Sequence, residues 1–222
     1  MFSLGSIGGT KIDVDFNFLI LVLLFVVINY DQQVGIQYAL IWIPILFVSV
    51  LIHELAHAAM IALFGFGASH VILTGMGGVT VNQRRAKPWQ DVLISLAGPA
   101  SSFGLMFLSE WIFNHVQVAR TDAMLFALLP RMYYANYFWG LFNLIPVAPL
   151  DGGHAVREFL NIFLPDRSSF VIYVWIAMIV GAGVAIYMFQ EGNYFIALYI
   201  AWFVYIAFEQ WQHFRRSGTP GD

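Results

Sequence analysis

Six apolar segments run through the sequence, and they restrict the possible fold more than any other feature. They span residues 16–28, 36–64, 92–113, 123–147, 170–189 and 194–208. A helix needs about 20 apolar residues to cross the hydrocarbon core of a bilayer, so the first segment is short and the last needs its aromatic flank. Apolar residues make up 60% of the chain and charged residues 10%, whereas soluble domains have roughly 45–50% and 25%. The sequence therefore predicts an α-helical polytopic membrane protein with about six transmembrane helices.

The basic residues divide unequally between the loops that six spans would create. With the N-terminus in the cytoplasm, the cytoplasmic side holds eight of them, namely Lys11, Arg84, Arg85, Lys87, Arg157, Arg167, Arg215 and Arg216. The opposite side holds only Arg120, and Arg131 falls inside a span. Cytoplasmic loops of membrane proteins are enriched in Lys and Arg. This division predicts six spans in an integral membrane protein with both termini in the cytoplasm.

Two segments lack the pattern of a membrane helix. Residues 70–81 have β-branched side chains on both sides of a glycine-rich centre, which is typical of a β-hairpin. Within residues 2–15, Ile12 and Val14 alternate with charged neighbours, which favours an extended strand. Open strand edges cannot face lipid. We therefore expect a small β-hairpin or sheet at the membrane interface or inside the helical bundle.

Charge and cysteine content exclude several kinds of site. The formal net charge is −3, and no cluster of Lys and Arg offers a face for phosphates, so the sequence predicts no nucleic-acid partner. The chain has no cysteine, which excludes disulfides and thiolate metal sites. Any metal ion must be bound by histidine and carboxylate.

The sequence HELAH at residues 53–57 places three ionisable groups inside the second apolar segment. Residues four apart on a helix share one face, about 6 Å apart along the axis. His53 and His57 can therefore converge on one ion, as a tetrahedral zinc site requires. Glu54 is rotated by about 100° from His53 and can reach a water at the metal without being a ligand. The alternative is a polar helix interface, which would be a costly use of three ionisable groups in an apolar span.

A third protein ligand must come from elsewhere in the chain. The remaining histidines lie in loops, in the hairpin or in the tail, at His70, His115, His154 and His213. Asp151 is the better candidate, because two prolines and two glycines around it interrupt the fourth apolar segment. Irregular backbone at membrane depth is tolerated only inside protein or beside water. The alternative is an Asp that caps a helix in a cytoplasmic turn.

Together, the two motifs resemble those of the site-2 protease family of intramembrane metalloproteases. That family pairs H-E-x-x-H on one span with N-x-x-P-x-x-x-L-D-G on a later one. The second pattern is matched by Asn143, Pro146, Leu150, Asp151 and Gly152. The resemblance runs from the N-terminal strand to about residue 160 and includes Ala97-Gly98-Pro99. The family often has Asn three residues after the Gly-Pro pair, where this chain has Ser102.

The resemblance implies a site and an activity. One zinc ion would be bound by His53, His57 and Asp151, with Glu54 as general base and Asn143 placing the substrate or stabilising the oxyanion. The implied activity is the hydrolysis of peptide bonds in membrane-spanning protein substrates, within the lipid bilayer. We expect a single transmembrane metalloprotease domain over residues 1–216 and a disordered tail at 217–222.

Other readings of the same features stay open. A membrane zinc-binding transporter would carry His and carboxylates on several spans, whereas the other apolar segments contain no His. A non-catalytic scaffold would not need Glu54 between two metal ligands. The hairpin at 70–81 either connects two helices or offers an edge to which an unwound substrate segment adds as a strand.

Overall fold

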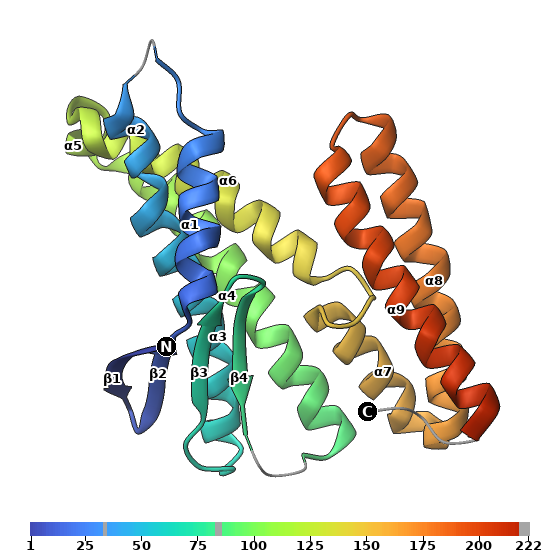
Figure 1. Cartoon of the computed structure of the whole chain (residues 1–222). Coiled ribbons are helices and arrows are strands. Elements are labelled where there is room, and N and C mark those ends of the chain that lie inside the picture. Colours follow the sequence, from blue (N-terminus) through green and yellow to red (C-terminus); the bar gives the residue numbers. More distant parts are fainter. Residues whose placement is uncertain (33–34, 83–85, 218–222) are drawn as a thin grey trace. The chain divides into compact units, whose positions relative to one another are not determined.

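The computed structural model describes residues 1–32, 35–82 and 86–217, and the chain divides into two compact units (Figure 1). The first unit comprises Met1–Arg85 and Ala97–Gly140, and the second comprises Ala86–Leu96 and Leu141–Asp222. Each unit has a hydrophobic core of its own.

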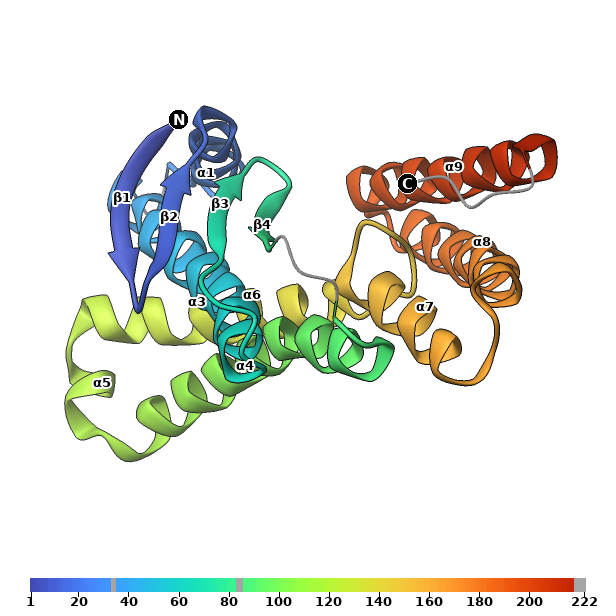
Figure 2. The ribbon, with the colours of Figure 1, turned by 90° about the horizontal axis from the view of Figure 1, so that it is seen from below.

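A four-stranded sheet belongs to the first unit (Figure 2). In spatial order, its strands are β1 (Phe2–Ile7), β2 (Thr10–Val14), β3 (His70–Thr74) and β4 (Gly77–Val81). The pairs β1–β2 and β3–β4 are antiparallel hairpins, and β2 pairs with β3 in parallel. The predictions of an extended N-terminal segment and of a hairpin at 70–81 are confirmed, and the two join into one sheet.

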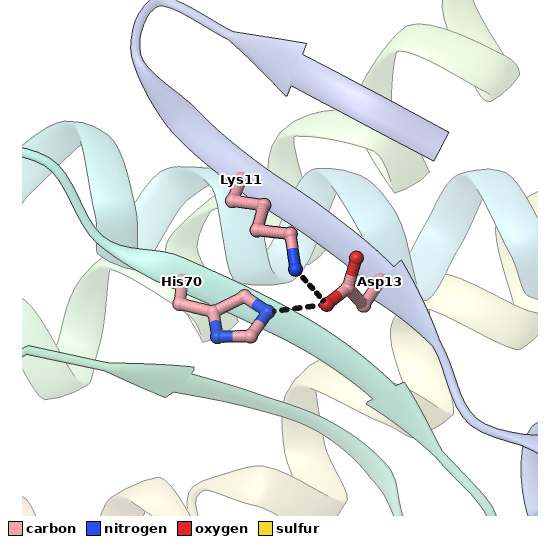
Figure 3. A network of polar contacts seen from close by, with 3 residues as sticks. All are labelled: Lys11, Asp13 and His70. Carbon is pink, nitrogen blue, oxygen red and sulfur yellow. Dashed lines mark hydrogen bonds and ion pairs between the residues drawn. The ribbon is translucent and has the colours of Figure 1, made fainter. Parts of the chain in front are cut away.

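A buried carboxylate ties the two parallel strands together (Figure 3). Asp13 Oδ2 on β2 accepts a hydrogen bond from Lys11 Nζ at 2.7 Å and lies 2.8 Å from His70 Nε2 on β3. The hydrogen bond from Lys11 lowers the pKa of Asp13 to about 2, and His70 acts in the same direction against the opposing effect of burial. The ionised form of Asp13 is therefore the one that holds β2 beside β3.

Helices cover one face of this sheet. The described helices that lie wholly or partly in the first unit are α1 (Phe16–Ile28), α2 (Ile36–Leu40), α3 (Trp42–Leu63), α4 (Pro88–His115), α5 (Gln117–Thr121) and α6 (Ala123–Asn143). Alternate side chains of β2 and β3 point to one side and are buried against α1 and α3; they are Ile12, Val14, Val71 and Leu73. This packing fixes the sheet against α3, because a shift of one residue would turn those side chains away from the core.

The second unit is built mainly from α7 (Asp151–Phe163), α8 (Asp166–Gln190) and α9 (Tyr194–Ser217). Helices α8 and α9 lie side by side as a hairpin (Figure 1). Gly181 permits their close approach, since a Cβ atom there would lie 2.5 Å from Val204 Cγ2. The predicted tail at 217–222 begins inside α9, which runs through Ser217, and its other residues lie outside the described part of the chain.

Within the described part of the chain, four helical segments are long and apolar enough to cross a membrane, namely Ile36–Leu63, Pro88–His115, Asp166–Gln190 and Tyr194–Ser217. All six predicted apolar segments form helices, but the count of about six spans is not confirmed. Helix α1 has only 13 residues, and α6, which carries Arg131, does not reach the same apolar character. The protein is thus a mostly helical integral membrane protein with a small sheet.

Candidate metal centre and active site

The H-E-x-x-H residues lie in the second half of α3 and face the interior of the first unit. His53, Glu54 and His57 keep only 2%, 5% and 6% of their surface exposed. The two imidazole ring centroids are 4.9 Å apart with planes inclined by 77°, and each ring offers a nitrogen within 4.8 Å of the other. This is the convergence that the i, i+4 spacing predicts on a helix.

Gly98 of α4 leaves open the space into which both imidazoles point. A Cβ atom at this position would lie 2.5 Å from His53 Nε2 and in direct contact with His57 Nε2. Both Nε2 atoms therefore face one small volume that a side chain would fill. Two imidazole nitrogens directed at one point form half of a tetrahedral ligand set, so the residues present fit a zinc ion.

Ser102, one turn further along α4, contacts the other nitrogen of His53. Its hydroxyl lies 3.0 Å from His53 Nδ1, and its side chain is completely buried. A partner at Nδ1 fixes the imidazole ring and leaves Nε2 available to bind a metal ion. The serine that stands where the family often has Asn therefore contacts a predicted metal ligand directly. This contact was not predicted, although the position of Ser102 after Gly98-Pro99 is the signal that could have found it.

Strand β4 supplies two contacts to the side chain of Glu54. Thr80 Oγ1 donates a hydrogen bond to Glu54 Oε2 at 2.8 Å and lies 3.1 Å from the Glu54 main-chain oxygen. A Cβ atom on Gly78 would lie 2.5 Å from both Cδ and Oε1 of the same carboxyl. The sequence indicates the hairpin but not its contact with Glu54, because contacts between a strand and a helix 26 positions away leave no local pattern.

Asn143 and Asp151 belong to the second unit, where they border the turn that follows α6. Helix α6 ends at Asn143 and α7 begins at Asp151, so the predicted interruption of the fourth apolar segment is confirmed. A Cβ atom on Gly152 or Gly153 would collide with main-chain atoms of residues 144–148. This close packing keeps Asn143, which is 8% exposed, and the half-buried Asp151 in fixed positions within their unit.

Helix α7 itself was not predicted. Its sequence begins Asp-Gly-Gly, and glycine is unfavourable inside a helix by roughly 1 kcal/mol relative to Ala. Gly152 and Gly153 are needed because the first turn of α7 touches the preceding main chain. The packing requirement therefore overrides the local propensity.

Comparison with known proteins identifies the family. A family model described as Peptidase M50B-like matches residues 18–148, which is more than half of the chain, and the model of Peptidase family M50 matches residues 112–186. The chain belongs to the M50 peptidase family. This confirms the predicted membership of the site-2 protease group.

Individual relatives of this M50 family chain are found in several organisms. A zinc metalloprotease of Methanocaldococcus jannaschii is 28% identical over 210 residues, which cover 92% of this chain and 58% of that protein. Rip3 of Mycobacterium tuberculosis is 39% identical over 116 residues, or 52% of this chain and 30% of Rip3. Stage IV sporulation protein FB of Bacillus subtilis is 31% identical over 122 residues, or 54% of this chain and 40% of its own length. The M50 chain thus spans about 30–58% of these relatives.

A solved structure shares the fold of the M50 chain. The site-2 protease from Methanocaldococcus jannaschii superposes with a TM-score of 0.63 over 94% of both chains, at 22% sequence identity. At this identity the likeness establishes the fold, and the chemistry has to be argued from the side chains.

Proposed function

We propose that this protein is a zinc-dependent intramembrane endopeptidase that hydrolyses peptide bonds of membrane-spanning substrates. The observation that carries the proposal is the pair of buried imidazoles whose Nε2 atoms meet beside Gly98, with the Glu54 carboxyl on the same helix. Family membership supports the reaction class.

The metal ligands in this proposal are His53, His57 and Asp151. Zinc, when bound, supplies a Lewis acid that lowers the pKa of a coordinated water to about 7 and polarises a carbonyl oxygen. The assignment of Asp151 rests on its place in the N-x-x-P-x-x-x-L-D-G pattern and on the close packing of Gly152 and Gly153 that holds it.

Glu54 serves as the general base. Its carboxyl is buried, which removes competing water, and one oxygen is fixed by Thr80. It accepts a proton from the attacking water and returns it to the leaving amine, and a positioned acid–base group of this kind contributes typically 10²–10⁴-fold to the rate. The Asn143 amide places the substrate or stabilises the oxyanion that forms on the scissile carbonyl.

Substrate binding is assigned to the outer edge of β4. Of the described strands, β4 stands at one end of the sheet, and its residues Gly78 and Thr80 touch Glu54. A helix hides its carbonyl groups in internal hydrogen bonds, so a membrane-spanning substrate must unwind before cleavage. An unwound segment that pairs with β4 would run about 4.8 Å from this strand. The alternative, a hairpin that only connects α3 to α4, does not explain why β4 contacts the general base.

The proposed arrangement in the membrane has six spans, with both termini in the cytoplasm and one transmembrane metalloprotease domain over residues 1–216. The support is the distribution of basic residues across the loops. Since the chain has no cysteine, single cysteines introduced at Ala86, Val118 and Leu160 can be labelled cleanly with an impermeant thiol reagent. Labelling of positions 86 and 118 from the same side would contradict the six-span arrangement.

The enzyme proposal is tested with Glu54→Gln, which keeps both histidines and removes the base. The probe is a purified peptide with about 20 apolar residues and a fluorophore–quencher pair at its ends, and bound zinc is measured in parallel. We expect near-stoichiometric zinc in Glu54→Gln with cleavage at background, while Glu191→Gln, a change at the exposed end of α8, behaves like wild type. Cleavage at the wild-type rate in Glu54→Gln would contradict the mechanism. Transport of zinc into liposomes without any cleavage would favour the transporter.

The third ligand is tested by a matched pair of helix-initiating aspartates. Asp151 begins α7 and Asp166 begins α8. If Asp151 binds zinc, Asp151→Ala should lose zinc and Asp166→Ala should keep it. If Asp151 only stabilises the start of its helix, both variants should keep zinc and show similar, small losses of thermal stability.

A further inference from the structure

Thr80 is the one hydroxyl on the described strands that contacts the carboxyl of Glu54, and sequence motifs give it no role. Its Oγ1 donates to Glu54 Oε2 at 2.8 Å and lies 3.1 Å from the Glu54 main-chain oxygen. Gly78, two positions earlier on the same strand, lies against the other carboxyl oxygen, Oε1. One face of β4 therefore touches both oxygens of the buried carboxyl, one by a hydrogen bond and one by close packing.

We propose that Thr80 is the positioning residue for Glu54, a role that rests on the proposed function of Glu54 as general base. A hydroxyl has one donor hydrogen and can also accept. It donates to Oε2 at 2.8 Å, and the same hydroxyl oxygen lies 3.1 Å from the Glu54 main-chain oxygen. Because this hydrogen bond holds Oε2, Oε1 is left as the oxygen that takes the proton from water, and the contact between Thr80 and Oε2 is kept throughout.

The register of the sheet makes this contact specific. Thr80 pairs with Val71 of β3, and Val71 is completely buried in the core that β3 shares with α3. A slip of one residue would place Val79 or Val81 opposite Glu54 and remove the hydrogen bond. Strand β4 is also the proposed docking edge for the substrate. Thr80 therefore connects the strand that would bind the substrate to Glu54, the proposed base.

The first test measures the carboxyl itself and needs neither metal nor substrate. In the infrared spectrum of the metal-free protein, the carboxylate band that disappears in Glu54→Gln belongs to Glu54. We expect this band to shift in Thr80→Val, which has the same shape without the hydroxyl, and to return toward its wild-type position in Thr80→Ser. An unchanged band in Thr80→Val would overturn the assignment.

The second test separates positioning from folding by kinetics on the same membrane-spanning fluorogenic peptide. We expect Thr80→Val to bind zinc stoichiometrically, to keep KM, and to lose about 10–100-fold in kcat, as typical for groups that orient reactive residues. Thr80→Ser should recover most of kcat. Thr74→Val is the control, because it removes a hydroxyl that accepts from Met76 N–H in the turn of the same hairpin and does not contact Glu54.

The possible outcomes distinguish this inference from the enzyme proposal. A wild-type protein that cleaves, together with a Thr80→Val variant that cleaves equally well, overturns the role of Thr80 alone. A rise in KM at constant kcat, or an equal loss in Thr74→Val, also overturns it, since strand docking or hairpin stability would then be the cause. If wild type does not cleave, the enzyme proposal fails, and the infrared band still decides whether Thr80 holds Glu54.

Discussion

A single methyl group on Gly98 should abolish metal binding without unfolding the protein. Gly98 lies buried in α4, and the added Cβ of Gly98→Ala would stand 2.5 Å from His53 Nε2 and 2.6 Å from His57 Cε1. Ordinary van der Waals contact begins at 3.4 Å. The imidazole of His53 would therefore have to retreat by about 0.9 Å, whereas zinc–ligand distances vary by only about ±0.2 Å.

The surroundings oppose such a retreat. His53 is buried and contacts Ser102 through Nδ1, and the ring of Trp139 stands edge-on at 6.3 Å between centroids. Changes to groups that only orient a ligand typically cost 10–100-fold in metal affinity. Displacing the ligand atoms themselves should therefore lower the zinc affinity by more than about 100-fold, which corresponds to about 2.7 kcal/mol of binding free energy.

The assay is zinc stoichiometry after dialysis against graded chelator, with the helical content followed by circular dichroism. Gly104→Ala is the matched control, because it makes the same change in the same helix at a site where a Cβ would meet no atom within 4 Å. We expect Gly104→Ala to keep zinc and helical content, and Gly98→Ala to keep helical content and lose zinc. Wild-type zinc affinity in Gly98→Ala would refute the conclusion that the two Nε2 atoms meet beside α4.

Three other substitutions probe the contact with Glu54, the α8–α9 hairpin and the buried carboxylate of the sheet. Gly78→Ala places a Cβ against the carboxyl of Glu54 and should lower kcat while zinc stays bound; loss of zinc instead would show that the metal ligands moved. Gly181→Ala overpacks the α8–α9 contact at a cost of about 1–3 kcal/mol and should lower the melting temperature, whereas Gly183→Ala, with no atom near its Cβ, should not. The pKa of Asp13 is about 2 in the folded protein and about 3.9 when unfolded, so its stabilising effect is present above pH about 4 and is lost as the pH falls toward 2. Hydrogen-exchange protection of β2 and β3 should fall across that range in wild type, and Asp13→Asn should lack this dependence.

Much of the fold could be predicted from local patterns. The apolar segments, the glycine-rich hairpin and the alternation around Ile12 each depend on residues close together in sequence, and each corresponds to a helix or a strand. The span count is different, because it depends on how a helix such as α6 meets the membrane. Arg131 donates to Ala127 O at 2.7 Å and stands over the ring of Tyr38 at 6.0 Å, so this charge is accommodated inside the first unit without an ionic partner among the described residues.

The candidate site could likewise be predicted only in part. His53, Glu54 and His57 could be found because a helix places i and i+4 on one face. The contacts that orient them could not, because they come from α4 and β4. The parallel pairing of β2 with β3 brings β4 to α3, and parallel strands require a crossover connection that no short pattern records. The sequence HVILTGMGGVTV indicates a hairpin. Nothing in it indicates which glycine position has no room for a side chain, or which hydroxyl donates a hydrogen bond to a carboxyl.

Two neighbours of α3 therefore contact two different parts of the proposed site. Helix α4 contacts the imidazoles, through the space at Gly98 and the hydroxyl of Ser102. Strand β4 contacts the proposed general base, Glu54, through Gly78 and Thr80. Helix α4 contacts the two histidines of the H-E-x-x-H motif, and β4 contacts its glutamate. Metal binding and proton transfer should therefore be separable by mutation. Changes on α4 should remove zinc and activity together, and changes on β4 should remove activity while zinc remains. A β4 variant that loses zinc in proportion to activity would show that the two sets of contacts form one coupled unit.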